Sequence, residues 1–455
     1  MKILLVVPPQ ASDIKKTLGL TGIPLGLAYL ASNLPKKHDV KIIDCLSEDI
    51  DLENLERMIK AYDPDVVGLT ATTPAIYEAY KVAIMVKRIN PDCKVSIGGP
   101  HATFTAKETL KECKAIDAVI RGEGEATFNE LITAWDRGSS LRGISGLTFR
   151  NNGGSIKNRD RPFIKDLDSL NFPAWNKLPM ARYSMHGKRF GMIMTSRGCP
   201  FNCIFCSSSL LCGKMWRSRS PENVLEELRL LRNDWGIREI EFMDDAFTLD
   251  NKRAEKICDM IRKEGLDITW TCSSRVNTIN EGLARKLKAA GCHTIYFGIE
   301  SGSQEILNRV GKGISLEQSK RAVRIAKKVK INSLGSFILG LPGDTAKTIK
   351  NTIKFARGLG LTFAQFTTAT PYPGTKLYAW AKRKRLLLSN RWSDFTTVKP
   401  VMKIPDVNIK QLRKALRSAY LSFYLKPMFF IDQIRAKNFI VIKNIFKSAL
   451  KNVLG

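Results

Sequence analysis

The stretch Arg197-Gly-Cys-Pro-Phe-Asn-Cys-Ile-Phe-Cys206 places three thiols at positions 199, 203 and 206, directly after the apolar run 191–195. A short apolar run of this kind predicts a buried strand, so the thiols follow the end of that strand. Three cysteines this close together can converge on one metal centre. A closed zinc site or an ordinary cubane cluster would use four protein thiolates, and the nearest further cysteine is Cys212. The spacing therefore favours an iron–sulfur cluster held by three thiolates, with one iron left open.

The residues after this motif alternate between short apolar runs and helical patterns. Such alternation predicts βα units, and six of them, counting the strand before the cysteines, make most of a βα barrel. Chemistry in such barrels lies at the C-terminal ends of the strands. The five further predicted strands are residues 239–242, 268–271, 294–297, 334–339 and 363–368.

The residues before the motif predict a separate α/β unit. Apolar runs at 3–7, 40–43, 66–69, 94–97 and 118–120 alternate with helical spacing, which indicates a doubly wound, flavodoxin-like parallel sheet. The glycine-rich stretch 138–161 predicts a hairpin and a linker. We expect four regions, namely an amino-terminal domain over 1–140, a linker over 141–185, a barrel over 186–385 and a basic helical region over 386–455.

The composition is that of a folded protein with one unusual property, its charge. The chain has 455 residues, 44% of them hydrophobic and 25% charged, which excludes fibrous and wholly disordered classes. No apolar run is long enough for a signal peptide or a membrane span, so we expect a cytoplasmic protein. The formal net charge of +30 suggests a polyanion, an anionic membrane surface or an acidic substrate as partner.

At the cysteine motif the sequence resembles the radical S-adenosylmethionine (SAM) superfamily. The resemblance implies that Cys199, Cys203 and Cys206 hold a [4Fe-4S] cluster whose open iron binds SAM. One-electron reduction, from a donor such as flavodoxin or ferredoxin, then yields methionine and a 5′-deoxyadenosyl radical. The cofactor carries out the chemistry and the protein orients it.

Further positions match this superfamily where the predicted strands end. Asp244 or Asp245, which the sequence does not distinguish, matches the acidic residue that contacts the methionine amino group. The resemblance further assigns Arg275 to the methionine carboxylate and Glu300 to the ribose hydroxyls. It assigns Gly340, Gly343 and Pro371 to backbone that approaches the adenine.

The loops of the amino-terminal domain resemble a cobalamin-binding domain. The chain has no Asp-x-His-x-x-Gly motif, whose histidine would ligate cobalt, so we expect cobalamin without a histidine lower ligand. Of the two early histidines, His38 is expected in a solvated turn and His101 as a loop contact. The positions that the resemblance assigns to cobalamin are Gly22, Gly26, Thr70, Thr72, Gly98, Gly99, His101, Gly122 and Glu123.

The paired domains resemble class B radical SAM methyltransferases and the anaerobic magnesium-protoporphyrin ester cyclase family. This resemblance implies methylation of an unactivated carbon, with the 5′-deoxyadenosyl radical as activator and methylcobalamin as methyl donor. A radical cyclase, oxidoreductase or rearrangement enzyme of the same architecture is the alternative. An RNA methylthiotransferase would carry extra cluster cysteines in its first domain, whereas Cys45, Cys93 and Cys113 are widely spaced, so we expect no specific nucleic acid.

The carboxyl-terminal region concentrates the positive charge. Residues 382–455 contain seventeen Lys and Arg against three Asp, and an apolar stripe at helical spacing lies within them. Two interpretations remain open: helices that cover the barrel with their lysines toward water, or helices that lie on an anionic membrane and deliver a lipid-like substrate. The stripe consists of Leu412, Leu416, Ala419, Tyr420 and Phe423.

Overall fold

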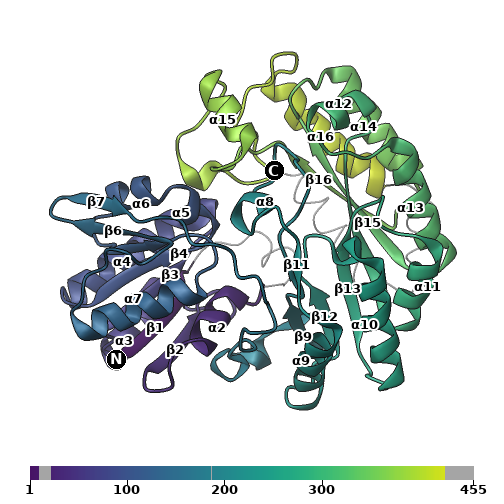
Figure 1. Ribbon diagram of the computed structural model, residues 1–455. Coiled ribbons are helices and arrows are strands. Elements are labelled where there is room, and N and C mark those ends of the chain that lie inside the picture. Colours follow the sequence, from purple (N-terminus) through teal and green to yellow (C-terminus); the bar gives the residue numbers. More distant parts are fainter. Residues whose placement is uncertain (10–21, 186, 426–455) are drawn as a thin grey trace.

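The computed structural model describes residues 1–9, 22–185 and 187–425 of the chain. It consists of two α/β units, with the short helix α8 (Ser208–Leu211) between them in the view of Figure 1. The amino-terminal unit carries the purple and blue part of the sequence, and the second unit carries the teal to green part.

The first unit is a sheet in the order β2-β1-β3-β4-β5-β6-β7, in which β1 to β5 are parallel. Its five parallel strands have the order 2-1-3-4-5 of flavodoxin-like sheets, which is the fold class that the sequence predicts. The antiparallel hairpin β6–β7 extends this sheet beyond residue 140. The strands are β1 (Lys2–Val7), β2 (Asp39–Asp44), β3 (Val66–Thr70), β4 (Lys94–Gly98), β5 (Ala118–Ile120), β6 (Leu147–Asn151) and β7 (Gly154–Lys157).

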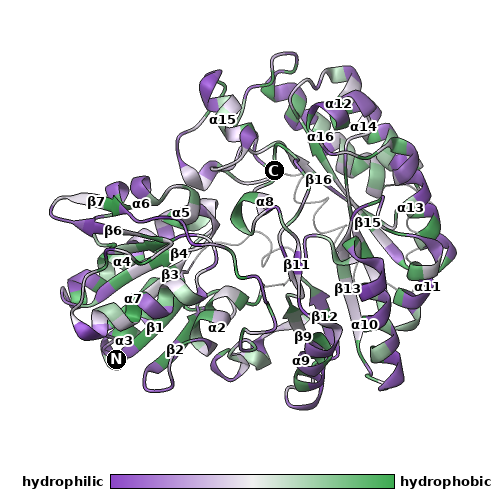
Figure 2. Ribbon diagram, in the orientation of Figure 1, coloured by the Kyte–Doolittle hydropathy of each residue, from purple (hydrophilic) through white to green (hydrophobic). Residues whose placement is uncertain are grey.

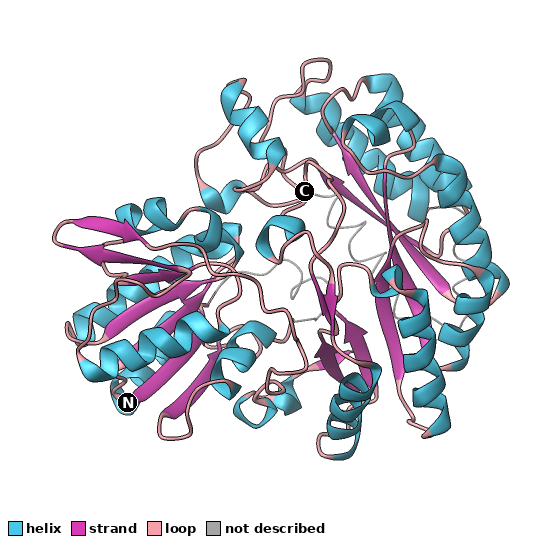
Figure 3. Cartoon of the chain, viewed as in Figure 1, coloured by secondary structure: helices cyan, strands magenta, loops and turns pink. Residues whose placement is uncertain are grey.

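Helices cover this sheet (Figure 3), so the central strands are apolar on both sides. Ile3, Leu4, Leu5 and Val6 of β1 are fully buried, as expected for a strand between two helical layers. In Figure 2 the central strands are correspondingly hydrophobic. The helices are α2 (Leu25–Ser32), α3 (Leu52–Tyr62), α4 (Ile76–Ile89), α5 (Pro100–Phe104), α6 (Ala106–Glu112) and α7 (Glu125–Arg137), with the 3-10 turn η1 (Thr73–Ala75).

The second unit is a curved sheet in the order β16-β15-β14-β13-β12-β9-β8. Its six long strands are parallel, which confirms the partial βα barrel, and β8 adds an antiparallel edge. The strands are β8 (Ser184–Met185), β9 (Lys188–Ile193), β12 (Glu239–Phe242), β13 (Thr269–Ser274), β14 (Cys292–Glu300), β15 (Asn332–Leu339) and β16 (Phe363–Thr368). Two short strands, β10 (Ser196–Arg197) and β11 (Arg217–Ser218), pair separately.

Helices line the outer side of this curved sheet (Figures 1 and 3). Most begin at a Ser, Thr, Asp or Asn whose side chain accepts a hydrogen bond from the backbone three residues on, which satisfies a donor that the helix leaves free. The helices are α9 (Pro221–Asn233), α10 (Asn251–Lys263), α11 (Glu281–Ala289), α12 (Gln304–Arg309), α13 (Leu316–Lys328), α14 (Ala346–Gly358), α15 (Lys376–Arg383) and α16 (Ile409–Tyr424), with 3-10 turns η4 (Phe247–Leu249) and η5 (Trp392–Asp394).

Alternate residues of each barrel strand face the outer helices or the inside of the barrel. On β12, Phe242 packs against the rings of Phe247 and Trp270, so the outer face is aromatic there. On β13, Cys272 is buried on the same outer side, next to Cys258 of α10. Residues between these, such as Glu241 and Thr271, therefore point into the barrel.

Residues after the barrel contact both units. Trp392, Phe395 and Val401 are buried in the same apolar cluster as α4 and the strands of the first unit. They close that unit on the side of η1, so its core is not made by residues 1–157 alone. The first unit is thus completed by a segment more than two hundred residues further along the chain.

The apolar stripe of α16 packs on the barrel. Leu412, Ala419 and Phe423 are buried, and the Tyr420 hydroxyl donates to the Phe366 carbonyl at 2.8 Å. The interpretation that this stripe faces a membrane is therefore wrong, because the stripe packs against strand β16. The rest of the predicted basic tail, residues 426–455, lies outside the described residues. Within the described ranges, no helix is both long and apolar enough to cross a bilayer.

Candidate functional site

The three cysteines of the motif lie on the loop that follows β10. Backbone hydrogen bonds hold this loop from two sides: the Ile204 amide donates to the Val310 carbonyl at 3.0 Å, and the Leu377 amide donates to the Ile204 carbonyl at 2.9 Å. Cys199, Cys203 and Cys206 are all half-buried. The loop that carries them is therefore fixed to two distant barrel segments while its thiols keep access to the space above the strands.

The surroundings of these thiols suit a metal cluster. Burial raises the pKa of the Cys199 and Cys206 thiols, and the neighbouring carboxylate of Asp245 and the other thiols act in the same direction. Thiolates here therefore need the positive charge of bound iron. In the described part of the chain, no three Cys, His, Asp or Glu side chains converge as ligands of a single ion would. A cluster is larger than one ion and holds its thiolates further apart, so the three-cysteine loop remains compatible with it.

Asp244 and Asp245 have different surroundings. Asp244 is buried and accepts hydrogen bonds from the Thr195 amide at 2.7 Å and from the Thr195 hydroxyl at 2.5 Å. It thereby ties the end of β12 to the segment after β9. Asp245 is exposed and lies near the cysteine loop, where its charge raises the pKa of Cys199 and Cys206. Of the two aspartates that the sequence leaves open, the geometry favours Asp245 as the carboxylate available to a ligand.

Arg275 and Glu300 lie beside the cysteine loop. The Arg275 guanidinium stacks 3.4 Å from the centre of the Phe201 ring, in that loop, and donates to the Lys312 carbonyl. Glu300 ends β14 with a positive φ of 69°, which is rare for a residue with a side chain and is a feature of functional sites. Its carboxylate pairs with the Lys312 ammonium at 2.7 Å, and both side chains are 8% exposed.

Lys312 is a site residue that the motifs did not indicate. It lies in the turn Gly311-Lys312-Gly313, where both glycines have positive φ and a Cβ at Gly311 would lie 3.0 Å from the Asn202 carbonyl oxygen. The only sequence signal that could have pointed to Lys312 was its position between two glycines. These glycines matter because the turn contacts the cysteine loop, about a hundred residues earlier, and the local sequence does not reveal that contact.

Backbone conformation and packing already account for the residues assigned to the adenine. Gly340 and Gly343 have positive φ angles of 83° and 89°, which other residues rarely adopt, so the backbone itself favours glycine at both positions. A Cβ at Gly340 would also lie 3.1 Å from Leu412 of α16. Pro371 is buried at the start of the segment that ends at Gly374, where a Cβ would collide with Phe104 of the first unit. The adenine assignment of Gly340, Gly343 and Pro371 stays a prediction.

The loops assigned to cobalamin gather at the C-terminal edge of the first sheet. Gly26 and Gly122 have open space where a Cβ would be, so a flat ligand can approach the backbone at both. Gly98 ends β4 and Gly99 follows it; a Cβ on Gly99 would lie 2.8 Å from the Ala71 carbonyl oxygen. The other assigned groups at this edge are the exposed Gly22 and Thr72 and the half-buried Thr70. This edge fits a large planar group.

Both early histidines are buried. His101 is 1% exposed, its Nδ1 lies 3.2 Å from the Thr73 hydroxyl, and its ring meets Trp392 edge-on at 4.9 Å. Burial lowers the pKa of His101 to about 4. It is thus packed between the first unit and the segment after the barrel. The expectation that His38 lies in a solvated turn is wrong, because its ring is covered and lies 3.4 Å from the amino terminus of Met1.

Glu123 belongs to a buried charge network that joins the two units. It pairs with Arg217 of β11 at 2.9 Å and with Arg197 of β10 at 3.4 Å, and Arg197 pairs with Glu125 at 2.6 Å. All four side chains are nearly covered. The two arginines flank the cysteine loop, Glu123 lies in the loop assigned to cobalamin, and Glu125 begins the helix α7 that follows that loop. The carboxylate of Glu123 therefore serves this junction, which the sequence did not predict.

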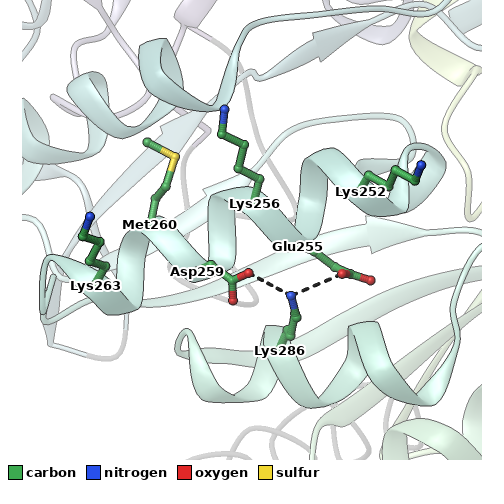
Figure 4. A pocket seen from close by; sticks show the side chains of 7 residues that line it. All are labelled: Lys252, Glu255, Lys256, Asp259, Met260, Lys263 and Lys286. Atoms are coloured by element: carbon green, nitrogen blue, oxygen red, sulfur yellow. Dashed lines mark hydrogen bonds and ion pairs between the residues drawn. The ribbon is translucent and has the colours of Figure 1, made fainter.

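A hollow of about 300 Å³ lies elsewhere, on the outside of the barrel between α10 and α11 (Figure 4). In Figure 4 Lys286 points to Asp259 and Glu255, at 2.8 and 3.3 Å. These are exposed pairs of a helical surface, and surface pairs of this kind contribute about 0–1 kcal/mol. The hollow is remote from the inner face of the strands.

Comparison with known proteins agrees with this geometry. The radical SAM superfamily model matches residues 193–356, and the B12 binding domain model matches residues 11–132. An uncharacterized methyltransferase of Pyrococcus horikoshii is 52% identical over 99% of this chain and 98% of its own. The anaerobic magnesium-protoporphyrin IX monomethyl ester cyclase of Rubrivivax gelatinosus is 31% identical over 94% of this chain and 78% of its own.

A solved structure shares the fold. The cobalamin-dependent SAM radical enzyme OxsB, with aqua-cobalamin and SAM bound, superposes with a TM-score of 0.76 at 16% identity, over 98% of this chain and 72% of that one. The fold and the site thus define an enzyme of radical chemistry. The chain belongs to the radical SAM superfamily, among the members that carry a B12 binding domain. As a radical SAM protein with a B12 binding domain, it uses a [4Fe-4S] cluster, SAM and cobalamin.

Proposed function

We propose that the protein transfers a methyl group to an unactivated carbon of its substrate. The observation that carries the proposal is the junction of the two units, where the cysteine loop and the loop assigned to cobalamin are joined by Arg197, Arg217, Glu123 and Glu125. The bound cofactors supply a hydrogen-abstracting radical and a methyl group. A substrate bound between these two loops would be within reach of both the radical and the methyl group.

The chain's own residues would hold and orient these groups. Cys199, Cys203 and Cys206 would bind the cluster, and Asp245 would accept hydrogen bonds from the amino group of SAM. Arg275, fixed by its stacking on Phe201, supplies a positive charge beside the cluster loop, and Lys312 sets the orientation of the Glu300 carboxylate. These assignments are the expected roles of groups that the fold brings to one side of the strands.

Radical cyclisation or oxidation without methyl transfer is the second candidate. The relation to the Rubrivivax cyclase favours it, since that protein is 31% identical over 94% of this chain. A lipid-like substrate, which the positive charge of the tail suggested, is compatible with either reaction.

The mass of the product distinguishes these reactions. We expect a compound in wild-type cells that is heavier, by one carbon and two hydrogens, than a precursor accumulating in a deletion strain. Mass spectrometry of both aqueous and lipid extracts would measure it, and labelled methyl groups of methionine should appear in the product. A deletion strain that accumulates a precursor of equal carbon number would contradict methyl transfer and favour the second candidate.

Cobalamin bound to the full chain is expected to lack an imidazole ligand from the protein. His101 is covered by Trp392 and Thr73, so its ring is held within the protein rather than presented to a ligand. The absorption and EPR spectra of bound cobalamin should therefore be the same in His101→Ala as in the wild type, with His293→Ala as the control. An imidazole signature that is present in the wild type and lost only in His101→Ala would refute this.

A further inference from the structure

The inner face of the barrel carries a row of in-register residues from three strands. Met192 of β9 is in register with Glu241 of β12, which is in register with Thr271 of β13. Residues in register on parallel strands point to the same face, and the aromatic packing of Phe242 on the outer side assigns this row to the inside. The row therefore forms a continuous strip of the inner wall.

Glu241 has no partner in this strip. Its side chain is half-buried, and no hydrogen bond or ion pair joins its carboxylate to any residue that the structure describes. Burial alone raises its pKa, with no nearby cation acting in the opposite direction. Partly burying a carboxylate without a partner is unfavourable, so such a group is expected where a ligand supplies the partner.

The other carboxylates on the inner side are paired. Glu239 lies 2.7 Å from the His293 ring nitrogen, and Glu300 lies 2.7 Å from the Lys312 ammonium. Each of these two carboxylates therefore has a hydrogen-bonding partner on a neighbouring element. Among the described strand residues of the barrel, Glu241 is the inward carboxylate left without such a partner.

Two hydroxyls accompany Glu241. Thr271 is 3% exposed, and its hydroxyl lies close to the Tyr296 hydroxyl, the one described group that acts as its neighbour in this strip. Tyr296 of β14 points inward on a neighbouring position; burial, and then the charge of Glu241, raises the pKa of its hydroxyl to about 12, so it stays a donor at neutral pH. The strip thus offers one carboxylate without a partner and two neighbouring hydroxyls, whose oxygens can still accept hydrogen bonds.

The strip lies between the elements assigned to the two cofactors. On one side, the Ile23 amide donates to the Met192 sulfur at 3.1 Å, so the strip touches the Gly22 loop of the first unit. On the other side, β14 continues from Tyr296 to Glu300, beside the cysteine loop. Met243, the next inward position after Glu241, is 43% exposed, so the strip is open toward the C-terminal ends of the strands.

We propose that Glu241, Thr271 and Tyr296 form a substrate subsite for a protonated amine. An ammonium group supplies the counter-charge that Glu241 lacks, and its remaining N–H groups have the two hydroxyls as acceptors. An anionic substrate group would be repelled at this position. The proposal rests on the proposed function in that the amine-bearing molecule is the methyl acceptor, held between the loop assigned to cobalamin and the cysteine loop.

The test compares three small probes of equal length. Hexylammonium, hexanol and hexanoate are titrated separately into the anaerobic holoenzyme, and binding is followed by ligand-observed NMR. Hexylammonium is expected to bind most tightly, and Glu241→Gln should weaken it at least about tenfold without changing hexanol. Glu255→Gln, which removes a carboxylate on the outside of the barrel, is the matched control and should change neither probe.

Equal binding of hexylammonium by the wild type and Glu241→Gln would overturn the proposal, as would tighter binding of hexanoate than of hexylammonium. Iron content, cobalamin content and reductive cleavage of SAM are measured on the same samples. If these are normal while probe binding does not depend on Glu241, the subsite is wrong and the proposed function stands. Should Glu241→Gln fail to fold, Thr271→Val serves instead, with a severalfold loss expected for hexylammonium only.

Discussion

Replacement of Cys199, Cys203 and Cys206 together by Ala is expected to remove the iron–sulfur cluster and to abolish reductive cleavage of SAM. The reconstituted wild type should contain about four irons per chain, and the triple variant close to none. The loop itself should keep its place, because its anchors are backbone bonds of Ile204 rather than contacts of the thiols. Iron analysis, EPR of the reduced protein and assay of 5′-deoxyadenosine measure the effect.

Cys212→Ala is the matched control for this experiment. Cys212 is a neighbouring half-buried thiol, and burial raises its pKa to about 12, so it is expected to stay a neutral thiol. Its replacement should leave iron content and cleavage near the wild-type level. Retained cleavage in the triple variant would end the assignment of the cluster to these cysteines, and loss of iron in Cys212→Ala would show a fourth ligand.

Arg197→Met is expected to destabilise the protein by about 3–5 kcal/mol. The substitution leaves the buried carboxylate of Glu125 without the guanidinium that lies 2.6 Å from it, and uncompensated buried charge is far more costly than a lost surface pair. Adding Glu125→Leu to Arg197→Met should recover much of the loss, since both buried charges are then gone. The wild type, Arg197→Met, Glu125→Leu and the double variant form a double-mutant cycle. Anaerobic urea unfolding of these four proteins gives the coupling free energy between the two side chains.

The control is an exposed pair of the same chemistry. Arg285 pairs with Glu281 at 2.5 Å on the surface of α11, with both side chains more than one third exposed. Arg285→Met should change the free energy of unfolding by less than about 1 kcal/mol. If Arg197→Met behaves like Arg285→Met, the junction between the two units is not held by this charge network.

The strands and the cysteine loop were predictable because local sequence determines them. A run such as Ile3 to Val7 is apolar on both faces and can only be a strand between helical layers, and the spacing of Cys199, Cys203 and Cys206 is itself the signal. The different roles of two adjacent residues were harder to predict. Asp244 and Asp245 differ in role because Asp244 is buried and accepts hydrogen bonds from Thr195, whereas Asp245 is exposed.

The remaining site residues depend on contacts between distant parts of the chain. Glu123 was expected to contact cobalamin, but its carboxylate meets Arg217, ninety-four positions later. The rings of His101 and Trp392 are in contact, although the two residues lie far apart in the sequence. No periodicity or motif records such pairs, so a single sequence predicts the cofactors and the sheet order but not the junction that aligns them.

The place of Trp392, Phe395 and Val401 in the core of the first unit affects how the protein is made. The ribosome completes the strands of this unit at Lys157, long before it reaches Trp392. At about 5–20 residues per second, the nascent first unit waits roughly 10 to 50 seconds with an apolar surface uncovered over η1 and α4. During that interval it is a natural client for chaperones, and a chain that stops short of residue 392 would keep this surface exposed.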